Sequence, residues 1–339
     1  MEFIKNGVFI IAELSANHNG DIQVAIDTVK AAKKAGADAI KLQTYTPDTM
    51  TLNVKRDEFM LHDTIWKGQY LYDLYQTAYT PWDWHAQIFD EAKKQGLICF
   101  SSPFDKTAVD FLEQFNPPVY KIASFEITDI PLIKYVAEKG RPIIISTGIA
   151  TEQDIDLALQ TCKDVGNYDI ALLKCTSSYP APIEKANLIM IKDMADKYGV
   201  ITGLSDHTLD IVSPILSVGM GAKIIEKHFI IDREIGGPDA SFSLDFTQFK
   251  AMVDAVRSAE KAIGKIDYSL APEKQKSRNL SRSIYIYKDV RKGEVISQNN
   301  IKILRPNFGI APINFDRVVG KKFNSNYTKG EPLQFNMIE

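Results

Sequence analysis

Cysteine is scarce in this sequence, and its three thiols lie far apart. Cys99, Cys162 and Cys175 form no C-x-x-C pair within the 339 residues, so neither a zinc ribbon nor a redox dithiol is predicted. Three cysteines in a chain of this length also exclude a small fold stapled by disulfide bonds. Such sparse use of cysteine suits a reducing compartment.

Long hydrophobic runs and an excess of one charge are also absent. No window approaches about 18 uninterrupted apolar residues, and the first residues show neither an apolar signal region nor a small-residue cleavage site. The 40 basic and 43 acidic side chains give a net charge of −3, whereas a dedicated nucleic-acid binder usually has a basic excess. We therefore expect a soluble cytoplasmic protein that binds neither membranes nor nucleic acid.

Eight short β-branched segments recur along the chain, and amphipathic segments separate them. Most are nearly continuous apolar runs, which is typical of strands buried on both faces of a parallel sheet. The predicted strands are residues 8–13, 39–44, 98–103, 119–124, 142–148, 170–177, 200–206 and 222–229. The predicted helices include residues 22–35, 83–95, 130–138, 151–162 and 246–263.

Eight predicted strands that alternate with helical segments predict a (β/α)8 TIM barrel over residues 1–264. An open, doubly wound sheet is the alternative, although no G-x-G-x-x-G motif follows the first strand. The long connection of residues 46–81 carries Trp66, Tyr70, Tyr72, Tyr75 and Tyr79, and we expect it to pack over one end of the barrel. Residues 265–282 are polar and predict a linker, and residues 283–339 predict a small β-rich domain with strands at 283–287 and 294–296.

The predicted strand ends are rich in polar residues, and the chemistry of such barrels takes place at the C-terminal strand ends. Lys41, Lys121 and Lys174 interrupt apolar strands, where a lysine is rare unless it is paired or functional. Together with nearby hydroxyl groups they predict a site for the phosphate or carboxylate of a small molecule. For each lysine the alternative is a solvent-facing residue or a buried ion pair.

Two adjacent strands each carry a histidine near their ends. His207 shares one side of the seventh strand with Ser205, and His228 shares one side of the eighth with Glu226. Such a pair can bind one divalent cation, with carboxylates and waters completing the shell, and oxygen-rich surroundings favour Mn2+ or Mg2+. A hydrogen-bonded core histidine is the alternative for each.

Three carboxyl side chains near the predicted strand ends are candidate acid–base groups or ligands of substrate hydroxyls. They are Glu13, Glu126 and Asp239. A salt bridge to a neighbouring lysine is the alternative reading of each. The glycine-rich loop of residues 236–239 is expected to place Asp239 over the barrel mouth.

Short motifs at these strand ends follow one another in a fixed order. They are A-E at 12–13 with N-H at 17–18, I-K-L-Q-T at 40–44, S-P-F at 102–104, K-I-A-S-F-E at 121–126, S-T-G at 146–148, C-T at 175–176 with Y-P at 179–180, G-L-S-D-H-T at 203–208 and E-K-H-F at 226–229. The ordered set resembles the sialic acid synthase family, and the tail from about residue 281 resembles that family's antifreeze-like (SAF) module. G-P-D-A-S-F-S-L at 237–244 resembles the family's pseudaminate branch.

The resemblance implies a reaction. Phosphoenolpyruvate would condense with a 2,4-diacetamido-2,4,6-trideoxy hexose of L-altro configuration and with water, giving pseudaminic acid and phosphate. Such nonulosonic acids typically decorate bacterial flagellin or surface glycans. N-acetylneuraminate or legionaminate synthesis is the alternative within the family.

The resemblance also implies a role for individual residues. Those implied to bind phosphoenolpyruvate are Lys41, Ser102, Lys121, Ser124, Ser146, Ser177 and Ser205, although relatives often have Thr at Ser102 and Asn at Ser177. Those implied to bind the sugar are Glu126, Tyr179, Asp239 and Arg305. Those implied to act in catalysis are Glu13, His207, His228 and Asp239. A divalent metal, Mn2+ or Mg2+ with Co2+ as a further option, would bind His207 and His228.

The resemblance further implies a domain-swapped homodimer, in which Arg305 reaches from the small domain into the barrel of a partner subunit. Two functions of other classes stay open on the residues alone. One is a class I aldolase with a Schiff base at Lys174 or Lys121. The other is a non-catalytic sugar-binding protein with the small domain as its binding module.

Overall fold

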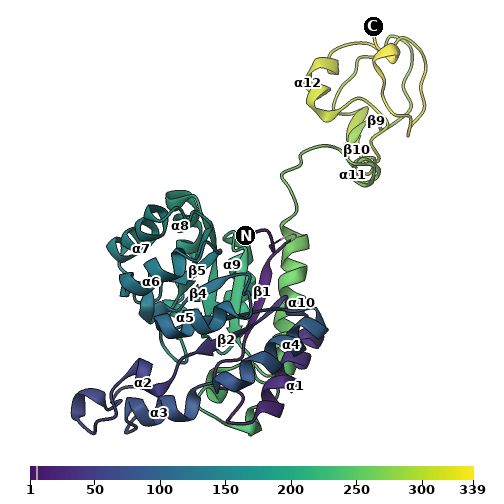
Figure 1. Cartoon of the computed structure of the whole chain (residues 1–339). Coiled ribbons are helices and arrows are strands. Elements are labelled where there is room, and N and C mark those ends of the chain that lie inside the picture. The colour runs from purple at the N-terminus through teal and green to yellow at the C-terminus, as the bar shows by residue number, and fades with distance from the viewer. Residues whose placement is uncertain (5–6) are drawn as a thin grey trace. The chain divides into compact units, whose positions relative to one another are not determined.

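The computed structural model describes residues 1–4 and 7–339, which fall into two units, Met1–Gly264 and Lys265–Glu339. The first unit is a closed barrel of eight strands in chain order, and all neighbouring strands are parallel (Figure 1). The strands are β1 (Phe9–Glu13), β2 (Ala39–Thr44), β3 (Ile98–Pro103), β4 (Tyr120–Ile122), β5 (Ile143–Ser146), β6 (Ile170–Cys175), β7 (Ile201–Asp206) and β8 (Ile224–His228). The predicted (β/α)8 barrel is confirmed, and the open sheet is excluded.

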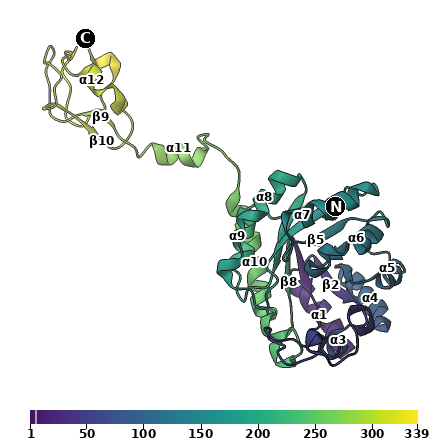
Figure 2. The ribbon, with the colours of Figure 1, turned by 90° about the vertical axis from the view of Figure 1, so that its left-hand side faces the viewer.

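Helices surround the barrel (Figure 2). They are α1 (Ile22–Ala35), α4 (His85–Gln95), α5 (Lys106–Glu113), α6 (Ile130–Ala137), α7 (Glu152–Asp164), α8 (Ile189–Tyr198), α9 (Val212–Gly219) and α10 (Phe246–Ile263). Local sequence sets their ends. The Asp21 side chain accepts a hydrogen bond from the Gln23 backbone at the start of α1, and a capping box of Thr151 and Asp154 opens α7.

Strands β4, β5 and β6 each end two residues earlier than the apolar pattern predicts. After β4 the chain turns into a 3-10 helix, η3 (Ser124–Thr128), where the Glu126 N–H donates to the Ala123 carbonyl instead of to a neighbouring strand. Polar residues beyond the strands therefore lie at the rim of the barrel, with Ser124 in η3 and Ser177 on a loop. Further 3-10 helices follow β6 and β8, namely η4 (Ile183–Lys185), η5 (Arg233–Ile235) and η6 (Ala240–Phe242).

The interior of the barrel changes from apolar to polar along the strands, because every second residue of each strand points inward. Near the N-terminal ends the inward residues form a buried apolar layer of Phe9, Ile11, Ala39, Phe100, Val119, Ile144, Ala171, Leu173 and Ile224. Nearer the C-terminal ends the inward residues are polar and equally buried: Glu13, Lys41, Ser102, Lys121, Ser146, Ser205 and Glu226. The apolar layer therefore closes the barrel beneath a polar floor.

The long connection of residues 46–81 contains α2 (Pro47–Met50) and α3 (Leu71–Ala78), and both helices lie at one end of the barrel in Figure 1. It also contains η1 (Asp57–Phe59) and leads into η2 (Trp82–Trp84). Its Trp66 side chain donates from Nε1 to the Pro238 carbonyl at 3.0 Å. The connection is thus fastened to the loop that follows β8, over one end of the barrel as predicted.

The second unit has a hydrophobic core of its own, formed mainly by Ile284, Ile286, Val290, Ile296, Ile301, Ile310, Val318, Phe323, Leu333 and Met337. Its two-stranded antiparallel sheet pairs β9 (Ser283–Ile286) with β10 (Ile301–Leu304). Helix α11 (Pro272–Arg278) lies within the expected linker. The short elements α12 (Phe315–Val318), η7 (Pro312–Asn314) and η8 (Phe335–Met337) complete the unit.

The prediction of a strand at residues 294–296 is wrong. Only Val295 pairs there, in an isolated bridge with Lys322, and the partner of β9 is β10. The Asn300 side chain donates to Glu294 and to the Val295 carbonyl. These two bonds close a turn between residues 294 and 300, and the regular pairing begins only after it.

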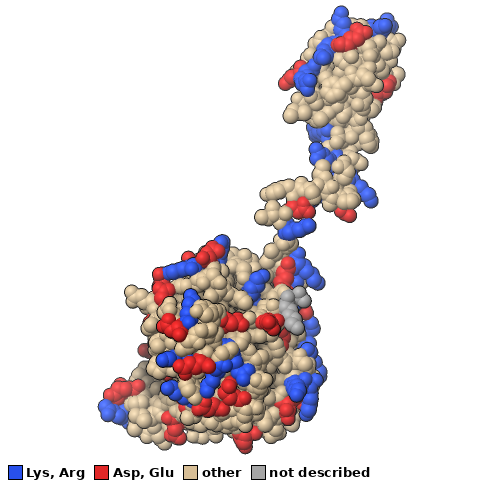
Figure 3. All heavy atoms as spheres, turned by 45° about the horizontal axis from the view of Figure 1, so that its top comes forward, with Lys and Arg blue, Asp and Glu red and all other residues tan. Residues whose placement is uncertain are grey.

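No helix in residues 1–4 or 7–339 is both long enough and apolar enough to cross a membrane. On the face shown in Figure 3, acidic and basic side chains are interspersed. This mixture agrees with the nearly balanced charge of the sequence.

At Gly203 on β7 the barrel leaves no room for a side chain. A Cβ there would lie 2.2 Å from the carbonyl oxygen of Ile224 on β8, and β8 would have to shift to admit it. We predict that Gly203→Ala lowers the free energy of unfolding by about 1–3 kcal/mol, as measured by chemical denaturation. Gly219→Ala is the matched control, because no atom of the described chain outside its own helix backbone lies within 4 Å of that Cβ. Equal stability of the two variants would contradict the packing argument.

Candidate active site

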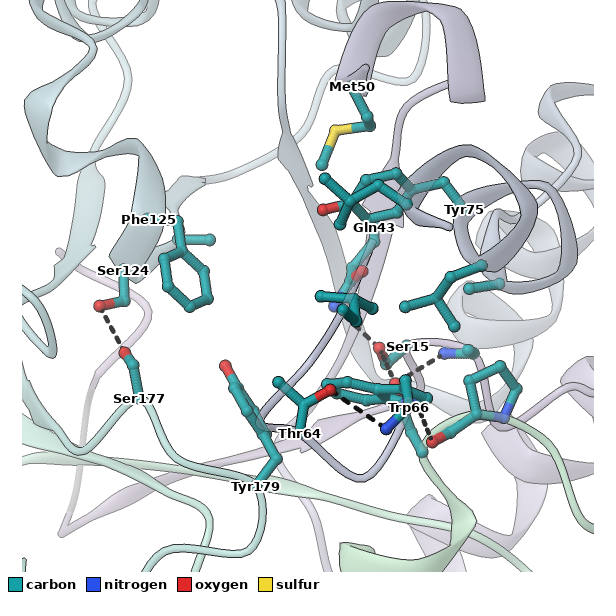
Figure 4. A pocket seen from close by; sticks show the side chains of 18 of the residues that line it. Ser15, Gln43, Met50, Thr64, Trp66, Tyr75, Ser124, Phe125, Ser177 and Tyr179 are labelled. Carbon is teal, nitrogen blue, oxygen red and sulfur yellow. Dashed lines mark hydrogen bonds between the residues drawn. The ribbon is translucent and has the colours of Figure 1, made fainter. Parts of the chain in front are cut away.

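A cavity of about 530 Å3 opens at the C-terminal end of the barrel (Figure 4). From the barrel it is lined by Ser15, Gln43, Ser124, Glu126, Ser177, Tyr179, His228 and Asp239. From the connection of residues 46–81 it is lined by Met50, Leu61, Asp63, Thr64, Trp66, Leu71, Leu74, Tyr75 and Ala78. One wall is therefore polar and built from strand ends and the loops that follow them, and the opposite wall is largely apolar and belongs to the connection.

Two lysines and two carboxylates meet in the polar floor of the barrel. The Lys41 ammonium lies 2.9 Å from Glu13 Oε2 and 3.6 Å from Glu226 Oε1. The Lys121 ammonium lies 3.1 Å from the same Glu226 oxygen, to which the Ser205 hydroxyl also donates at 3.1 Å. All five side chains are buried. The expected convergence of Lys41 and Lys121 on one site is present.

The two carboxylates of this cluster have opposite pKa shifts. Burial opposes ionisation of Glu226, but the ammonium groups of Lys121 and Lys41 outweigh it and lower its pKa to about 2. Burial dominates at Glu13 and, only partly offset by Lys41, raises its pKa from 4.5 to about 7. Glu226 is thus a permanent negative charge, whereas Glu13 can hold or release a proton near neutral pH.

Glu226 is one residue of the site that sequence reasoning missed. It shares one side of β8 with His228 but was not among the expected site residues. Its position in line with His228 was the available signal, because inward positions of one strand repeat every two residues. Only the paired register of β8 with β1 and β7 brings Glu226 between the two lysines.

Lys174, the third expected cation, does not join the site. It lies on the face of β6 that Leu172 also occupies, against the helices, and its ammonium donates to Thr176 Oγ1 at 3.3 Å and to the Cys175 carbonyl. Its neighbour Cys175 faces the site instead, with Sγ 3.9 Å from His207 Nδ1. The predicted trio of lysines is therefore a pair, and Lys174 cannot form a Schiff base in this cavity.

His207 and His228 come together at the barrel mouth, with ring centroids 5.3 Å apart. His207 Nδ1 donates to the Thr176 carbonyl at 3.1 Å, so the neutral form of the ring carries its lone pair on Nε2. Such a bond on the other ring nitrogen commonly orients a metal-binding histidine. Burial lowers the pKa of His228 well below its usual value and keeps its ring neutral.

The donor set at this point fits a divalent cation. The Nδ1 atom of His228 is buried without a hydrogen-bond partner in the described part of the chain, and Asp239 Oδ2 lies 3.9 Å from it. Within residues 1–4 and 7–339 no group of three or more His, Cys, Asp or Glu side chains forms a metal cage. A cation held here would take its remaining ligands from water or substrate, as catalytic sites with open positions do.

The expected serines line the same region. Ser177 Oγ donates to Ser124 Oγ at 2.8 Å (Figure 4), and the Lys41 ammonium donates to Ser102 Oγ at 3.2 Å. Ser146 Oγ is buried without a partner among the described residues. Gly148 allows the Ser124 and Ser177 hydroxyl groups to lie close together, because a Cβ at this position would be 2.2 Å from Ser177 Oγ and 2.7 Å from Ser124 Oγ.

Aromatic side chains form the wall beside the histidines. Tyr179 lies 4.4 Å from the His207 ring and 5.2 Å from Phe242, measured between centroids. Phe242 lies 4.9 Å from His228, and Trp66 lies 5.9 Å from Tyr179. Nothing in the local sequence of Trp66 indicates that it lines the cavity.

The remaining expected sugar ligands lie in two places. Glu126 lines the cavity with its Oε2 buried and unpartnered in the described chain, and burial raises its pKa to about 7. Arg305 belongs to the second unit, directly after β10, and its side chain is exposed.

Comparison with known protein families matches residues 28–268 to the NeuB family and residues 281–339 to the SAF domain. The first match extends over most of the barrel unit. The chain belongs to the NeuB family. The expected resemblance to sialic acid synthases and their SAF module is thereby confirmed.

Curated relatives of this NeuB-family chain include pseudaminic acid synthases from two genera. The protein from Campylobacter jejuni is 48% identical over 327 residues, which cover 96% of this chain and 95% of the relative. The protein from Helicobacter pylori is 46% identical over 331 residues, 97% of each. Among solved structures, the N-acetylneuraminic acid synthetase of Leptospira borgpetersenii is 30% identical with a TM-score of 0.72, covering 80% of this chain and 90% of its own.

Glu126 should make the stability of this NeuB-family protein depend on pH. Between pH 4.5 and about 7 the folded chain holds a proton on Glu126 that the unfolded chain has lost, so stability falls as pH rises, by up to about 1.4 kcal/mol per pH unit. We predict that Glu126→Gln flattens the stability profile in this window, as measured by chemical denaturation across pH. Glu184→Gln, at an exposed carboxylate, should leave the slope unchanged. Parallel profiles for wild type and Glu126→Gln would disprove the assignment.

Proposed function

We propose that this chain condenses phosphoenolpyruvate with 2,4-diacetamido-2,4,6-trideoxy-β-L-altropyranose and water to give pseudaminic acid and phosphate. The observation that carries the proposal is the meeting of Lys41 and Lys121 with His207 and His228 at one barrel mouth. The pseudaminic acid synthases at 46–48% identity over nearly the whole chain support it.

Phosphoenolpyruvate carries a phosphate and a carboxylate, and its site must supply positive charge and hydrogen-bond donors. In our proposal Lys41 and Lys121 supply the charge. The hydroxyl donors are Ser102, Ser124, Ser146, Ser177 and Ser205. An anion beside Glu13 would raise the pKa of that carboxyl further, so Glu13 would hold its proton when the substrate is bound.

The reaction forms one bond between carbons and breaks one bond to phosphate. C3 of phosphoenolpyruvate attacks the aldehyde carbon of the open-chain sugar, and the aldehyde oxygen takes up a proton. Water adds at C2, and the bond from C2 to the phosphate oxygen breaks as phosphate leaves. We propose that Glu13 or Asp239 positions or deprotonates this water. A divalent cation on His207 and His228, Mn2+, Mg2+ or Co2+, would supply polarisation of the aldehyde.

The wall of Trp66, Tyr179 and Phe242 suits the methyl group of a 6-deoxy sugar better than a hydroxymethyl group. This favours a 6-deoxy substrate over N-acetylmannosamine. A legionaminate precursor is also a 6-deoxy sugar, but the N,N'-diacetyllegionaminic acid synthase of Legionella pneumophila is only 37% identical. We place the reaction in the cytoplasm, where the three buried free thiols stay reduced.

Phosphate release tests the function directly. We predict turnover with the L-altro 6-deoxy sugar, a rate at least about a hundredfold lower with N-acetylmannosamine, and inhibition by EDTA that Mn2+ or Mg2+ reverses. Borohydride trapping of a pyruvate-type substrate should label no lysine. Covalent labelling would instead indicate a class I aldolase. Failure to release phosphate with any amino sugar would favour a sugar-binding protein.

We further propose a domain-swapped homodimer in which Arg305 meets an acetamido group in the partner subunit's barrel. His207→Ala and Arg305→Ala should each fold and each lose most activity. Mixing equal amounts should restore up to about a quarter of wild-type activity. About half of the dimers would then contain one subunit of each variant, and one of the two sites in each such dimer would hold both intact residues. Light scattering should confirm that each variant is dimeric. An inactive mixture with proven subunit exchange would show that both residues act within one chain.

A further inference from the structure

Ser15 occupies an unfavourable backbone conformation at the edge of the cavity. It follows β1 with a φ of 46°, in the left-handed region that non-glycine residues rarely adopt and pay for in conformational energy. It is also buried, at 3% exposure. A glycine would adopt this turn without strain, so a side chain at this position calls for a reason.

The hydroxyl of Ser15 bonds two polar side chains of the cavity, Asp239 and Gln43. Its Oγ donates to Asp239 Oδ2 at 2.5 Å and accepts from Gln43 Nε2 at 2.8 Å. The same Gln43 nitrogen donates to Glu13 Oε1 at 3.0 Å. Figure 4 shows Gln43 and Ser15 side by side in this arrangement. One chain of hydrogen bonds therefore connects the two carboxyl groups that the proposed reaction uses.

Asp239 needs such an anchor because it stands on a loop. The loop follows two glycines with positive φ, Gly236 and Gly237, and its backbone is tied to Trp66 and Ser243. The carboxylate itself is held differently. Within the described residues its hydrogen bonds come from the turn after β1, from the Ser15 hydroxyl and from the Ala16 N–H at 3.3 Å, and both reach Oδ2.

We propose that Ser15 is a positioning residue of the reaction: from its left-handed turn it fixes the Asp239 carboxylate beside His228 and couples it through Gln43 to Glu13. The proposal rests on the proposed function, in which Asp239 faces the reacting centre. A carboxylate held in one orientation is ready for the transition state, whereas one that rotates on a loop is correctly placed only part of the time.

The test separates the hydroxyl from the turn. Ser15→Ala removes the hydroxyl and keeps the strained backbone, and Ser15→Gly removes both. Asn116→Ala is the matched control, because Asn116 is exposed, has a φ of 49° and lies outside the cavity. Ser15→Cys keeps the shape of the side chain and replaces the hydroxyl by a thiol, which is a weaker hydrogen-bond donor. Steady-state phosphate release with the L-altro sugar gives kcat and both KM values, and thermal unfolding reports the fold of each variant.

We expect kcat to fall at least about tenfold in both Ser15→Ala and Ser15→Gly, with KM for phosphoenolpyruvate within about twofold of wild type, since no Ser15 contact reaches Lys41 or Lys121 among its described bonds. Ser15→Cys should be intermediate, and Asn116→Ala should keep wild-type kcat. Wild-type kcat in Ser15→Gly would overturn the proposal, as would kcat values that follow thermal stability across the four variants. A wild-type enzyme without turnover would instead refute the proposed function, and the positioning role with it.

Discussion

Two ammonium groups share one buried carboxylate inside the barrel, and the rest of the site depends on this contact. Lys41 and Lys121 both approach Glu226 Oε1. A charge that is buried without a partner costs several kcal/mol, so each of these three side chains keeps the other two in place. Two positive charges against one permanent negative charge leave the floor attractive to an anion. Glu13, whose pKa lies near 7, adjusts the balance by holding or releasing a proton.

The barrel makes this cluster possible because it separates two kinds of interior. The apolar layer that contains Phe100 and Ile144 seals the barrel from below, and the layer of buried polar side chains lies above it. Electrostatic interactions are strong in such a place, since little water screens them. The apolar wall of the cavity combines Trp66 of the connection of residues 46–81 with Tyr179 and Phe242 of the barrel loops, whereas the charged floor belongs to the strands.

Much of the fold could be predicted from the sequence because its signals are local and periodic. Each of these signals can be recognised within a few neighbouring residues: the eight apolar runs, the helix-capping residues and the polar composition that begins after residue 264. The prediction failed where a side-chain hydrogen bond or the face of a strand decides. Residues 294–296 have the composition of a strand, yet the Asn300 side chain closes a turn there. Lys174 has the same apolar neighbourhood as Lys121, yet it lies on the other face of its strand.

The candidate site was predictable as a set of strand ends but not as a geometry. Residues such as His207 and Lys41 stand out because polar side chains in apolar runs are costly unless they are used. Glu226, Ser15 and Trp66 do not stand out, because their importance comes from partners that are far away in the chain: Lys121, Asp239 and Tyr179.

The sequence by itself determined the barrel, the family resemblance and the polar character of the rim, because strand alternation and helix capping are properties of short segments. The tertiary structure alone decided which lysines share Glu226 and which hydroxyl holds Asp239. Those choices follow from the register in which the eight strands pair around the barrel, and a shift of one residue in that register would turn every inward side chain outward.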